Sequence, residues 1–436
     1  MKVVQVIPNF GIGGTQKAGC VLAAGLAEAG NTAVVVGRGP GPRYLENPPE
    51  GVTHHLSEAT DDTTYAQEII SLEPDVIHLH DGAYNEELIE ALAKAGARVD
   101  GWPLLVQTPV FGRPPKDRAT LGRVRTCLIG AYMLYRQRHW MSMSTAEAIR
   151  NGIGYVHINS FERTEPPQST LDSPEVRAAR RAELGVPNDA FVVGRIGRDT
   201  MEKWHPLHEP MIDRLLSKHE NAAWLSIGMP VDRGRDRLKA RWGDRFVNPP
   251  ESPDFLVLAK TFAAMDVQAF FSCWGECFST TICEAAGVGL PTIAGTNPLR
   301  DNGQSEQLID GENGFLVSGI DQALGHIDHL ISDPEACQRL KQQTFDYAHA
   351  RWTTKQITQD LLAFYNAWTD PNPAAAPHLK WVAETEGKFA AGYRNRIVGL
   401  QSDGIASGLW WRMKLAAVAN WNTFRLGVRF KNYIRG

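Results

Sequence analysis

The sequence lacks most of the features that mark secreted, membrane-spanning or nucleic-acid-binding proteins. Its 436 residues include only six cysteines, scattered along the chain, which favours a reduced cytoplasmic protein over a disulfide framework. No apolar run reaches the ~18 residues needed to span a bilayer. The N-terminal apolar run is too short for a signal peptide and has no cleavage site. The formal net charge of −4 offers no excess of positive charge to nucleic acid, so we expect no nucleic-acid partner.

Metal-binding patterns are also missing. Cys273, Cys277 and Cys283 lie near one another, but their spacing fits no common zinc pattern. The chain contains no Asp-x-Asp motif that could hold a divalent ion. We therefore expect no metal site.

What is present is the composition of a globular protein, with 43% hydrophobic and 22% charged residues. The length corresponds to two or three domains. In the first half, short apolar runs expected to be buried strands alternate with stretches of helical spacing at 15–29 and 86–95. The expected strands are Val3–Ile7, Ala33–Val36, Val76–Leu79 and Leu104–Val106. This alternation predicts a parallel sheet covered by helices on both faces.

The same pattern restarts near residue 190, after a Pro-, Ser- and Thr-rich stretch at 164–174 that is typical of a linker. The strands expected here are Phe191–Ile196, Ala223–Ile227, Val267–Phe271 and Thr292–Ala294. The sequence therefore predicts two α/β units of similar size.

The end of the chain has a different composition. Residues 371–436 contain ten Lys and Arg against three Asp and Glu, and no acidic residue follows Gly404. The aromatic residues after that point are Trp410, Trp411, Trp421, Phe424, Phe430 and Tyr433. Basic and aromatic side chains favour an anionic membrane interface, so we expect residues 405–436 to dock on one. Packing of the tail on the protein itself, or on a protein partner, is the alternative.

A glycine-rich loop, Gly11-Ile12-Gly13-Gly14, follows the first expected strand. Glycine lets a backbone approach a ligand, and a following helix N-terminus offers free N–H groups to an anion. The loop does not match a dinucleotide fingerprint, because Gln16 stands where the third glycine would fall. Taken alone, a plain tight turn explains the glycines equally well.

Charged residues follow two strands of the second unit. Arg198 and Lys203 come after its first strand, where they could neutralise a diphosphate; two solvated surface charges are the alternative. Glu276 and Glu284 flank Ser279, which can cap a helix whose first N–H groups face a phosphate. The two carboxylates could accept hydrogen bonds from sugar hydroxyls, although an ordinary helix can also carry two surface glutamates.

In this order, the features resemble the retaining GT-B glycosyltransferases of family 4, also called group 1, over about residues 1–368. The matching segments are the glycine loop at 13–14, the strand end at 75–80, the segment 157–159, the pair Arg198 and Lys203, the E-x7-E motif from Glu276 to Glu284, and the loop 306–314. The resemblance implies two Rossmann-like, doubly wound α/β domains facing a central cleft. The expected parts are an acceptor domain at 1–165, a linker at 166–175, a nucleotide-sugar-binding domain at 176–352, a helix at 353–370 returning to the first domain, and the tail at 371–436.

The resemblance also implies roles for the charged residues. Arg198 and Lys203 would hold the diphosphate of a nucleotide-sugar donor, and Glu276 would contact the donor sugar. The leaving diphosphate gains charge in the transition state, so cations aimed at it lower the barrier. By the same resemblance, sugar transfer retains the anomeric configuration through front-face attack.

Other matching residues would shape the donor site. Glu284 would bind the donor ribose, and backbone amides at Ser279, Thr280 and Thr281 would support the phosphates. Gly13 and Gly14 would let the first domain close over the reaction centre.

One position departs from the family pattern. The family usually places a histidine after the fourth strand of the first domain, where this chain has Pro109. A proline there offers only a carbonyl acceptor. His80, at the end of a neighbouring strand, is a candidate sugar or acceptor contact, with a structural histidine as the alternative.

The expected function is metal-independent transfer of a sugar, such as a hexose, from a nucleoside-diphosphate sugar to a glycan or lipid-linked glycan, as in polysaccharide biosynthesis. The donor would be a substrate carrying UDP or GDP, with no cofactor besides. The expected location is cytoplasmic, with the tail on the inner face of the membrane. A nucleotide-sugar epimerase of the same fold, or a nucleotide-sugar-binding protein without turnover, is the alternative.

Overall fold

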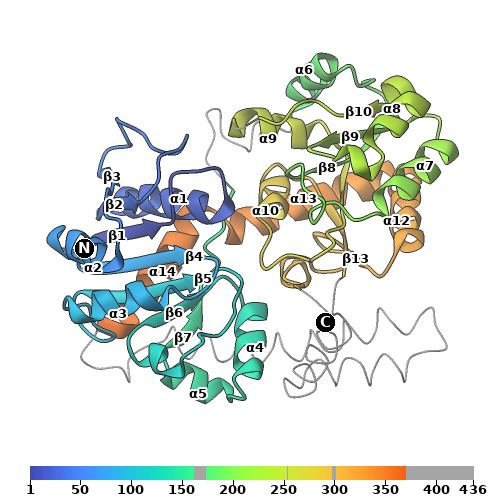
Figure 1. Cartoon of the computed structure of the whole chain (residues 1–436). Coiled ribbons are helices and arrows are strands. Elements are labelled where there is room, and N and C mark those ends of the chain that lie inside the picture. The colour runs from blue at the N-terminus through green and yellow to red at the C-terminus, as the bar shows by residue number, and fades with distance from the viewer. Residues whose placement is uncertain (162–172, 253, 297–300, 370–436) are drawn as a thin grey trace. The chain divides into compact units, whose positions relative to one another are not determined.

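A computed structural model describes residues 1–161, 173–252, 254–296 and 301–369 (Figure 1). Its described residues divide into two compact units, one formed by Met1–Ser160 with Thr354–Thr369, the other by Phe161–Thr353. Most of the expected linker and the whole basic tail at 371–436 lie outside the described residues.

The first unit is built on a seven-stranded sheet with the order β3-β2-β1-β4-β5-β6-β7, in which every pairing is parallel. Its strands are β1 (Lys2–Ile7), β2 (Thr32–Gly37), β3 (Val52–Leu56), β4 (Val76–Asp81), β5 (Leu104–Pro109), β6 (Arg125–Leu128) and β7 (Ile153–Tyr155). The central strands β1, β4 and β5 are buried along almost their whole length, as expected for strands covered on both faces.

The helices of the first unit include one that is distant in sequence. They are α1 (Gly14–Glu28), α2 (Asp62–Ser71), α3 (Glu86–Lys94), α4 (Ala131–Trp140), α5 (Thr145–Arg150) and α14 (Thr354–Thr369). Figure 1 shows α14, in orange, among the blue elements of this unit. A methyl group on Gly25 of α1 would lie 2.2 Å from Thr358 Oγ1. Glycine therefore permits the close approach of α1 and α14.

The second unit has a six-stranded parallel sheet with the order β10-β9-β8-β11-β12-β13. Its strands are β8 (Phe191–Ile196), β9 (Ala222–Ile227), β10 (Phe246–Val247), β11 (Val267–Phe270), β12 (Thr292–Gly295) and β13 (Gly314–Val317). Its helices are α6 (Pro174–Leu184), α7 (His208–Lys218), α8 (Arg235–Trp242), α9 (Phe255–Ala263), α10 (Thr280–Gly287), α11 (Gln304–Gln307), α12 (Ile320–Ser332) and α13 (Pro334–Arg351).

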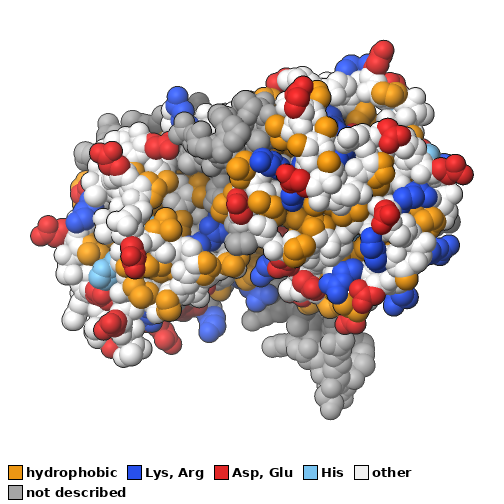
Figure 2. Space-filling view, turned by 90° about the horizontal axis from the view of Figure 1, so that it is seen from above, with side chains coloured by type: hydrophobic (Ala, Val, Ile, Leu, Met, Phe, Trp, Pro, Cys, Tyr) orange, Lys and Arg blue, Asp and Glu red, His pale blue; other side chains and the backbone are white. Residues whose placement is uncertain are grey.

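Two hydrophobic clusters form the main core of the second unit. One includes Trp204, Trp224 and Phe246, and the other includes Phe262 and Met265. On the face shown in Figure 2, acidic and basic side chains of the described residues are interspersed. No helix among the described residues is both long and apolar enough to cross a bilayer.

The predicted fold class is confirmed, because both units contain a parallel sheet alternating with helices. The expected strands coincide with β1, β2, β4, β5, β8, β9, β11 and β12. Strands β3, β6, β7, β10 and β13 were not expected. They are short, from two to five residues, and β3 carries partly exposed His54 and His55 instead of a continuous apolar run.

Asp266, directly before β11, connects several elements of the second unit. Its Oδ2 accepts hydrogen bonds from Val192 N at 2.8 Å and from Arg181 Nη2 at 2.9 Å. Lys341 Nζ lies 3.6 Å from Oδ1, and Arg177 forms a further ion pair. Burial acts to raise the pKa of this carboxyl, but the cations of Lys341, Arg177 and Arg181 outweigh it and lower the pKa.

We expect Asp266→Asn to reduce the free energy of unfolding by about 3 kcal/mol, because it leaves buried cations without a counter-charge. Asp321→Asn, which removes an exposed pair with Arg214, is the control and should cost less than about 1 kcal/mol. Urea unfolding of both variants measures the difference. Equal losses would contradict the role given to Asp266.

The effect of Asp266 should depend on pH. Its pKa in the folded protein lies below the ordinary value of 3.8, so its contribution to stability is complete above that value. It is lost as the pH falls through the lowered pKa. The stability difference between wild type and Asp266→Asn should therefore shrink in acid.

Candidate donor site of the second unit

Two neighbouring strands of the second unit deliver charged residues to the same edge of the sheet. Strand β8 is followed by a loop with Arg198 and Lys203, and its neighbour β11 is followed by a loop with Glu276. In open α/β sheets, ligands bind outside the carboxyl ends of the strands. The topology therefore places these residues where a ligand site is expected.

Lys203 and Glu276 are in direct contact. Lys203 Nζ donates to Glu276 Oε1 at 2.8 Å and to Oε2 at 2.9 Å. The two side chains are 27% and 13% exposed, so the pair is partly shielded from water. The cation expected to hold the donor diphosphate and the carboxylate expected to contact the donor sugar therefore bind each other in this structure.

Arg198 lies at the surface of the same loop. Its side chain is exposed and forms no ion pair within the part of the chain that the structure describes. Its backbone carbonyl accepts a hydrogen bond from Trp204 Nε1 at 3.1 Å, which fixes the turn of the loop. The guanidinium is therefore available to an anion while its backbone is held.

Backbone hydrogen bonds join the two loops. His205 N donates to Phe271 O at 3.3 Å, and Cys273 N donates to Glu202 O at 3.0 Å. These contacts link both ends of the segment around Lys203 to the loop that carries Glu276. The relative position of the two charged side chains thus rests on main-chain contacts as well as on their own ion pair.

A third loop, after β12, fixes the backbone of Glu276. Gly303 N donates to Glu276 O at 2.6 Å, and a Cβ at Gly303 would lie 1.8 Å from Cys277 O. Gly275 has φ +73°, and a Cβ there would lie 1.5 Å from Asp301 O. Because the colliding atoms are backbone oxygens, only glycine fits either position.

Helix α10 begins at the other end of the Glu276 loop. Ser279 is its N-cap, and its Oγ accepts from Ile282 N at 3.4 Å. The Ser279 amide donates to Gln307 Oε1 at 2.7 Å, and Gln307 Nε2 donates back to Ser279 O at 2.8 Å. Of the three amides expected to support phosphates, that of Ser279 is thus bound by Gln307. Those of Thr280 and Thr281 open the helix, and the half-buried Glu284 follows one turn later.

Two residues of this site received no role from the sequence. Gln307 braces the N-terminus of α10, and Arg195 near the end of β8 is buried beneath the Lys203 loop, 1% exposed. An arginine inside the otherwise apolar strand Phe191–Ile196 is a signal that could have identified Arg195. Gln307 gives no such signal, because its side chain binds mainly the backbone of Ser279, with Cys283 Sγ as a further contact at 3.3 Å.

The remaining expected site residues lie in the first unit. Gly13 is the N-cap of α1, with φ −157°, and Gly14 opens the helix. A Cβ on Gly14 would meet nothing within 4 Å, and one on Gly13 would approach only the flexible end of Gln16. Packing within the described residues therefore does not demand these two glycines.

His80 is part of a buried polar network. It is 2% exposed, and its Nε2 contacts Gln5 Oε1. Gln5 Nε2 donates to Tyr365 Oη on α14, which also contacts His78 Nδ1 at 2.7 Å. Burial lowers the pKa of His80 to about 3, so its ring is neutral at neutral pH. This geometry favours the structural alternative for His80.

Pro109 ends β5 and is buried. Its carbonyl, the single hydrogen-bonding group that a proline offers, accepts from Gly112 N at 2.7 Å. The position occupied by a histidine in the resembled family is therefore engaged in a local turn.

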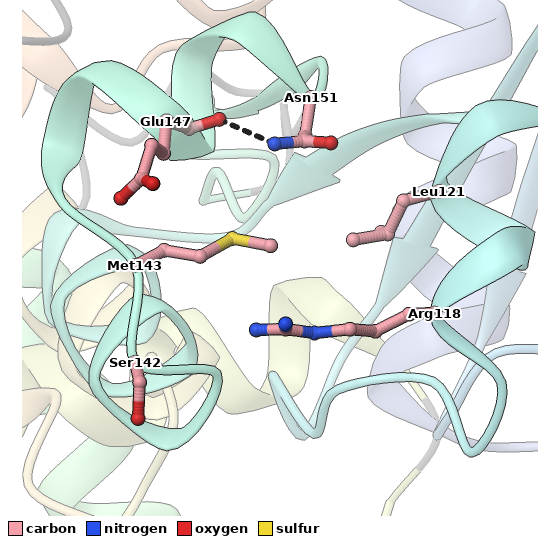
Figure 3. A pocket seen from close by; sticks show the side chains of 6 residues that line it. All are labelled: Arg118, Leu121, Ser142, Met143, Glu147 and Asn151. Carbon is pink, nitrogen blue, oxygen red and sulfur yellow. Dashed lines mark hydrogen bonds between the residues drawn. The ribbon is translucent and has the colours of Figure 1, made fainter.

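A separate pocket of about 290 Å³ lies in the first unit (Figure 3). Its lining residues precede β6 and β7, so it lies near the amino ends of these strands: Arg118, Leu121, Ser142, Met143, Glu147 and Asn151. Asn151 Nδ2 donates to Glu147 O at 2.7 Å, and the Glu147 carboxylate accepts from Ser144 N at 2.7 Å. These hydrogen bonds stabilise the short helix α5. None of the expected site residues lines this pocket.

Comparison with known proteins agrees with this architecture. The chain is 28% identical over 228 residues to a D-inositol 3-phosphate glycosyltransferase of Stackebrandtia nassauensis, covering 47% of this chain and 49% of that protein. It is 30% identical over 209 residues to the protein of the same name from Mycobacterium tuberculosis, covering 44% and 40%. The chain thus spans about half, or less, of the length of the curated relatives it matches. No protein-family model matches the chain.

Solved structures extend the similarity to both units. A glycosyltransferase from Rickettsia africae superposes with a TM-score of 0.66 at 14% identity, covering 84% of this chain and 98% of that one. Anabaena Alr3699/HepE in complex with UDP-glucose gives 0.60 at 16% identity, covering 83% and 98%. The chain therefore has the fold of the GT-B glycosyltransferases, and the expected resemblance to them is confirmed.

We expect Gln307→Leu to lower the free energy of unfolding by roughly 2 kcal/mol, since a buried group left without a partner costs about 1–3 kcal/mol. The variant leaves the Ser279 amide without its partner and removes one of two hydrogen bonds to the Ser279 carbonyl, which keeps the one from Cys283 N at 3.4 Å. Gln342→Leu, on the exposed face of α13, should change stability by less than about 0.5 kcal/mol. Chemical denaturation compares the two, and a loss of similar size in Gln342→Leu would contradict the bracing role.

Proposed function

We propose that the protein is a glycosyltransferase that takes a sugar from a nucleoside-diphosphate sugar bound at the carboxyl edge of the second sheet. The observation that carries the proposal is the convergence of Lys203, Glu276 and the N-terminus of α10 at that edge, with Arg198 exposed beside them. The names of the sequence relatives, and the UDP-glucose bound to the similar Anabaena protein, support it.

The proposed chemistry follows from charge. The diphosphate becomes more negative as the glycosidic bond to it breaks, and preorganised cations stabilise that change most strongly. Arg198 and Lys203 would supply the cations, and Glu276 and Glu284 would accept hydrogen bonds from the hydroxyls of the sugar and the ribose. Transfer with retention would place the acceptor oxygen on the same face of the sugar as the leaving group.

The acceptor proposed is a glycan or a lipid-linked glycan. A lipid-linked acceptor would suit a chain whose residues 405–436 carry six basic side chains and no acid. Similar proteins differ in the acceptors or pathways that their names give. The sequence relatives are named for D-inositol 3-phosphate, and one similar structure is a glycosyltransferase involved in lipopolysaccharide biosynthesis.

Nucleotide-sugar binding without turnover is the second candidate. It is favoured by Pro109, whose position offers neither a histidine ring nor a free carbonyl. A donor-hydrolysis assay separates the two candidates, because only a catalyst releases free sugar from the donor. Epimerisation of the donor in the absence of an acceptor would support an epimerase instead.

The proposed function is tested by a thermal-shift screen of UDP- and GDP-sugars with wild type and two matched variants. A ligand at 100 times its dissociation constant stabilises by about 2.7 kcal/mol, enough to identify a donor. Lys203→Ala should lose most of the shift. Glu202→Ala, next to it but exposed, should keep it. Equal shifts in the two variants, or no shift with any donor, would argue against a donor site at Lys203.

We predict that activity is independent of divalent metal. Arg198 and Lys203 would provide the positive charge that a metal ion supplies elsewhere, and the sequence has no Asp-x-Asp motif. Transfer rates measured in EDTA and in manganese should agree within about twofold. Complete loss in EDTA with recovery on adding manganese would overturn this prediction.

We predict that the full chain sediments with anionic vesicles and that high salt releases it. Each Lys or Arg near an anionic surface contributes about 1 kcal/mol, so the six basic residues of 405–436 suffice at low salt. A chain truncated after Pro377 should stay in the supernatant. If both chains sediment equally, the tail is not the anchor.

A further inference from the structure

Arg195 is a buried cation in direct contact with the Lys203 loop. It is the fifth residue of β8, its side chain is 1% exposed, and its Nη2 donates to the backbone carbonyl of Lys203. Its Nε and Nη1 are buried without a hydrogen-bond partner among the described residues. Burying a guanidinium with two unsatisfied nitrogen atoms costs free energy of folding, so another interaction is expected to offset that cost.

Aromatic rings offset part of that cost. The guanidinium carbon lies 4.1 Å from the ring centroid of Phe270 and 5.2 Å from that of Trp204. The neighbouring His208 adds no second charge, because burial, with the nearby Arg195 as a smaller cause, lowers its pKa to about 3. Arg195 is thus a single positive charge enclosed by rings at the base of the site.

Among the carboxylates, Glu276 is the one whose charge acts on Arg195. Its negative charge helps to keep Arg195 protonated against the effect of burial, which alone lowers the pKa of the guanidinium. Glu276 therefore interacts with two cations: with Lys203 through bidentate hydrogen bonds, and with Arg195, which itself contacts the Lys203 carbonyl, through charge alone. Only Lys203 is partly exposed and able to turn towards a ligand.

We propose that Arg195 is a positioning residue: it remains as the counter-charge of Glu276 when Lys203 leaves that carboxylate to bind the diphosphate of the donor. The inference rests on the proposed function. In the ligand-free protein, Glu276 competes with the diphosphate for Lys203. Without Arg195, the largely buried carboxylate of Glu276 would have no counter-charge once Lys203 left it. Transfer of Lys203 from Glu276 to the diphosphate would then become unfavourable.

The test is a double-mutant cycle that uses inorganic pyrophosphate as the probe, with affinities measured by calorimetry on the full chain. Glu276→Gln removes the competitor for Lys203 and should raise the affinity for pyrophosphate roughly tenfold. Arg195→Met should lower it by a similar factor. In the Glu276→Gln background, Arg195→Met should have little effect, because there is no carboxylate to hold Lys203 back.

The outcomes separate this role from a purely structural one. If Arg195 only supported the loop, Arg195→Met would weaken binding by the same factor in both backgrounds, which would overturn the inference. Arg177→Met removes an arginine of α6 that contacts Met265 and Asp266, just before β11. It is the matched control and should leave the affinity for pyrophosphate within about twofold.

Should Arg195→Met fail to fold, the affinity of Glu276→Gln decides alone, and an unchanged or weaker affinity contradicts the inference. If wild type binds neither pyrophosphate, UDP nor GDP, the proposed donor site itself is refuted.

Discussion

Lys203 and Glu276 come from loops that follow neighbouring strands, and the bidentate contact between them organises the candidate site. The ion pair has this geometry because the main chain on each side is fixed independently. His205 and Cys273 bind the opposite loop through their amides, and Gly303 binds the carbonyl of Glu276. Lys203 can therefore change partners without a rearrangement of the main chain, so the cost of the exchange is confined to the side chains.

The fold was predictable where strands are buried on both faces. In β1, β4, β8 and β9, short runs rich in apolar and β-branched residues indicate buried strands, and the structure places these strands inside the sheets, away from their edges. Edge and short strands were missed because their side chains need not be apolar. β3 shows this, with His54 and His55 facing partly solvated surroundings.

The candidate site was predictable only as a set of residue types at strand ends. Arg198, Lys203 and Glu276 stand out because charged groups after buried strands point to a ligand. The pairing of Lys203 with Glu276 was not predictable, since it depends on two loops 70 residues apart that are joined by amide hydrogen bonds. Gln307 was missed for a related reason: its main partners are the amide and carbonyl of Ser279, and backbone atoms leave no trace in a sequence.

The contribution of α14 to the first unit affects how the chain is completed during synthesis. Tyr365 binds His78, although 287 residues separate them. At translation rates of 5–20 residues per second, the ribosome needs roughly 15–60 s to make that interval. During that time His78, which is buried in the folded protein, lacks its partner Tyr365. All strands of the second sheet are made before α14. The unit that begins first is therefore the one that is finished last.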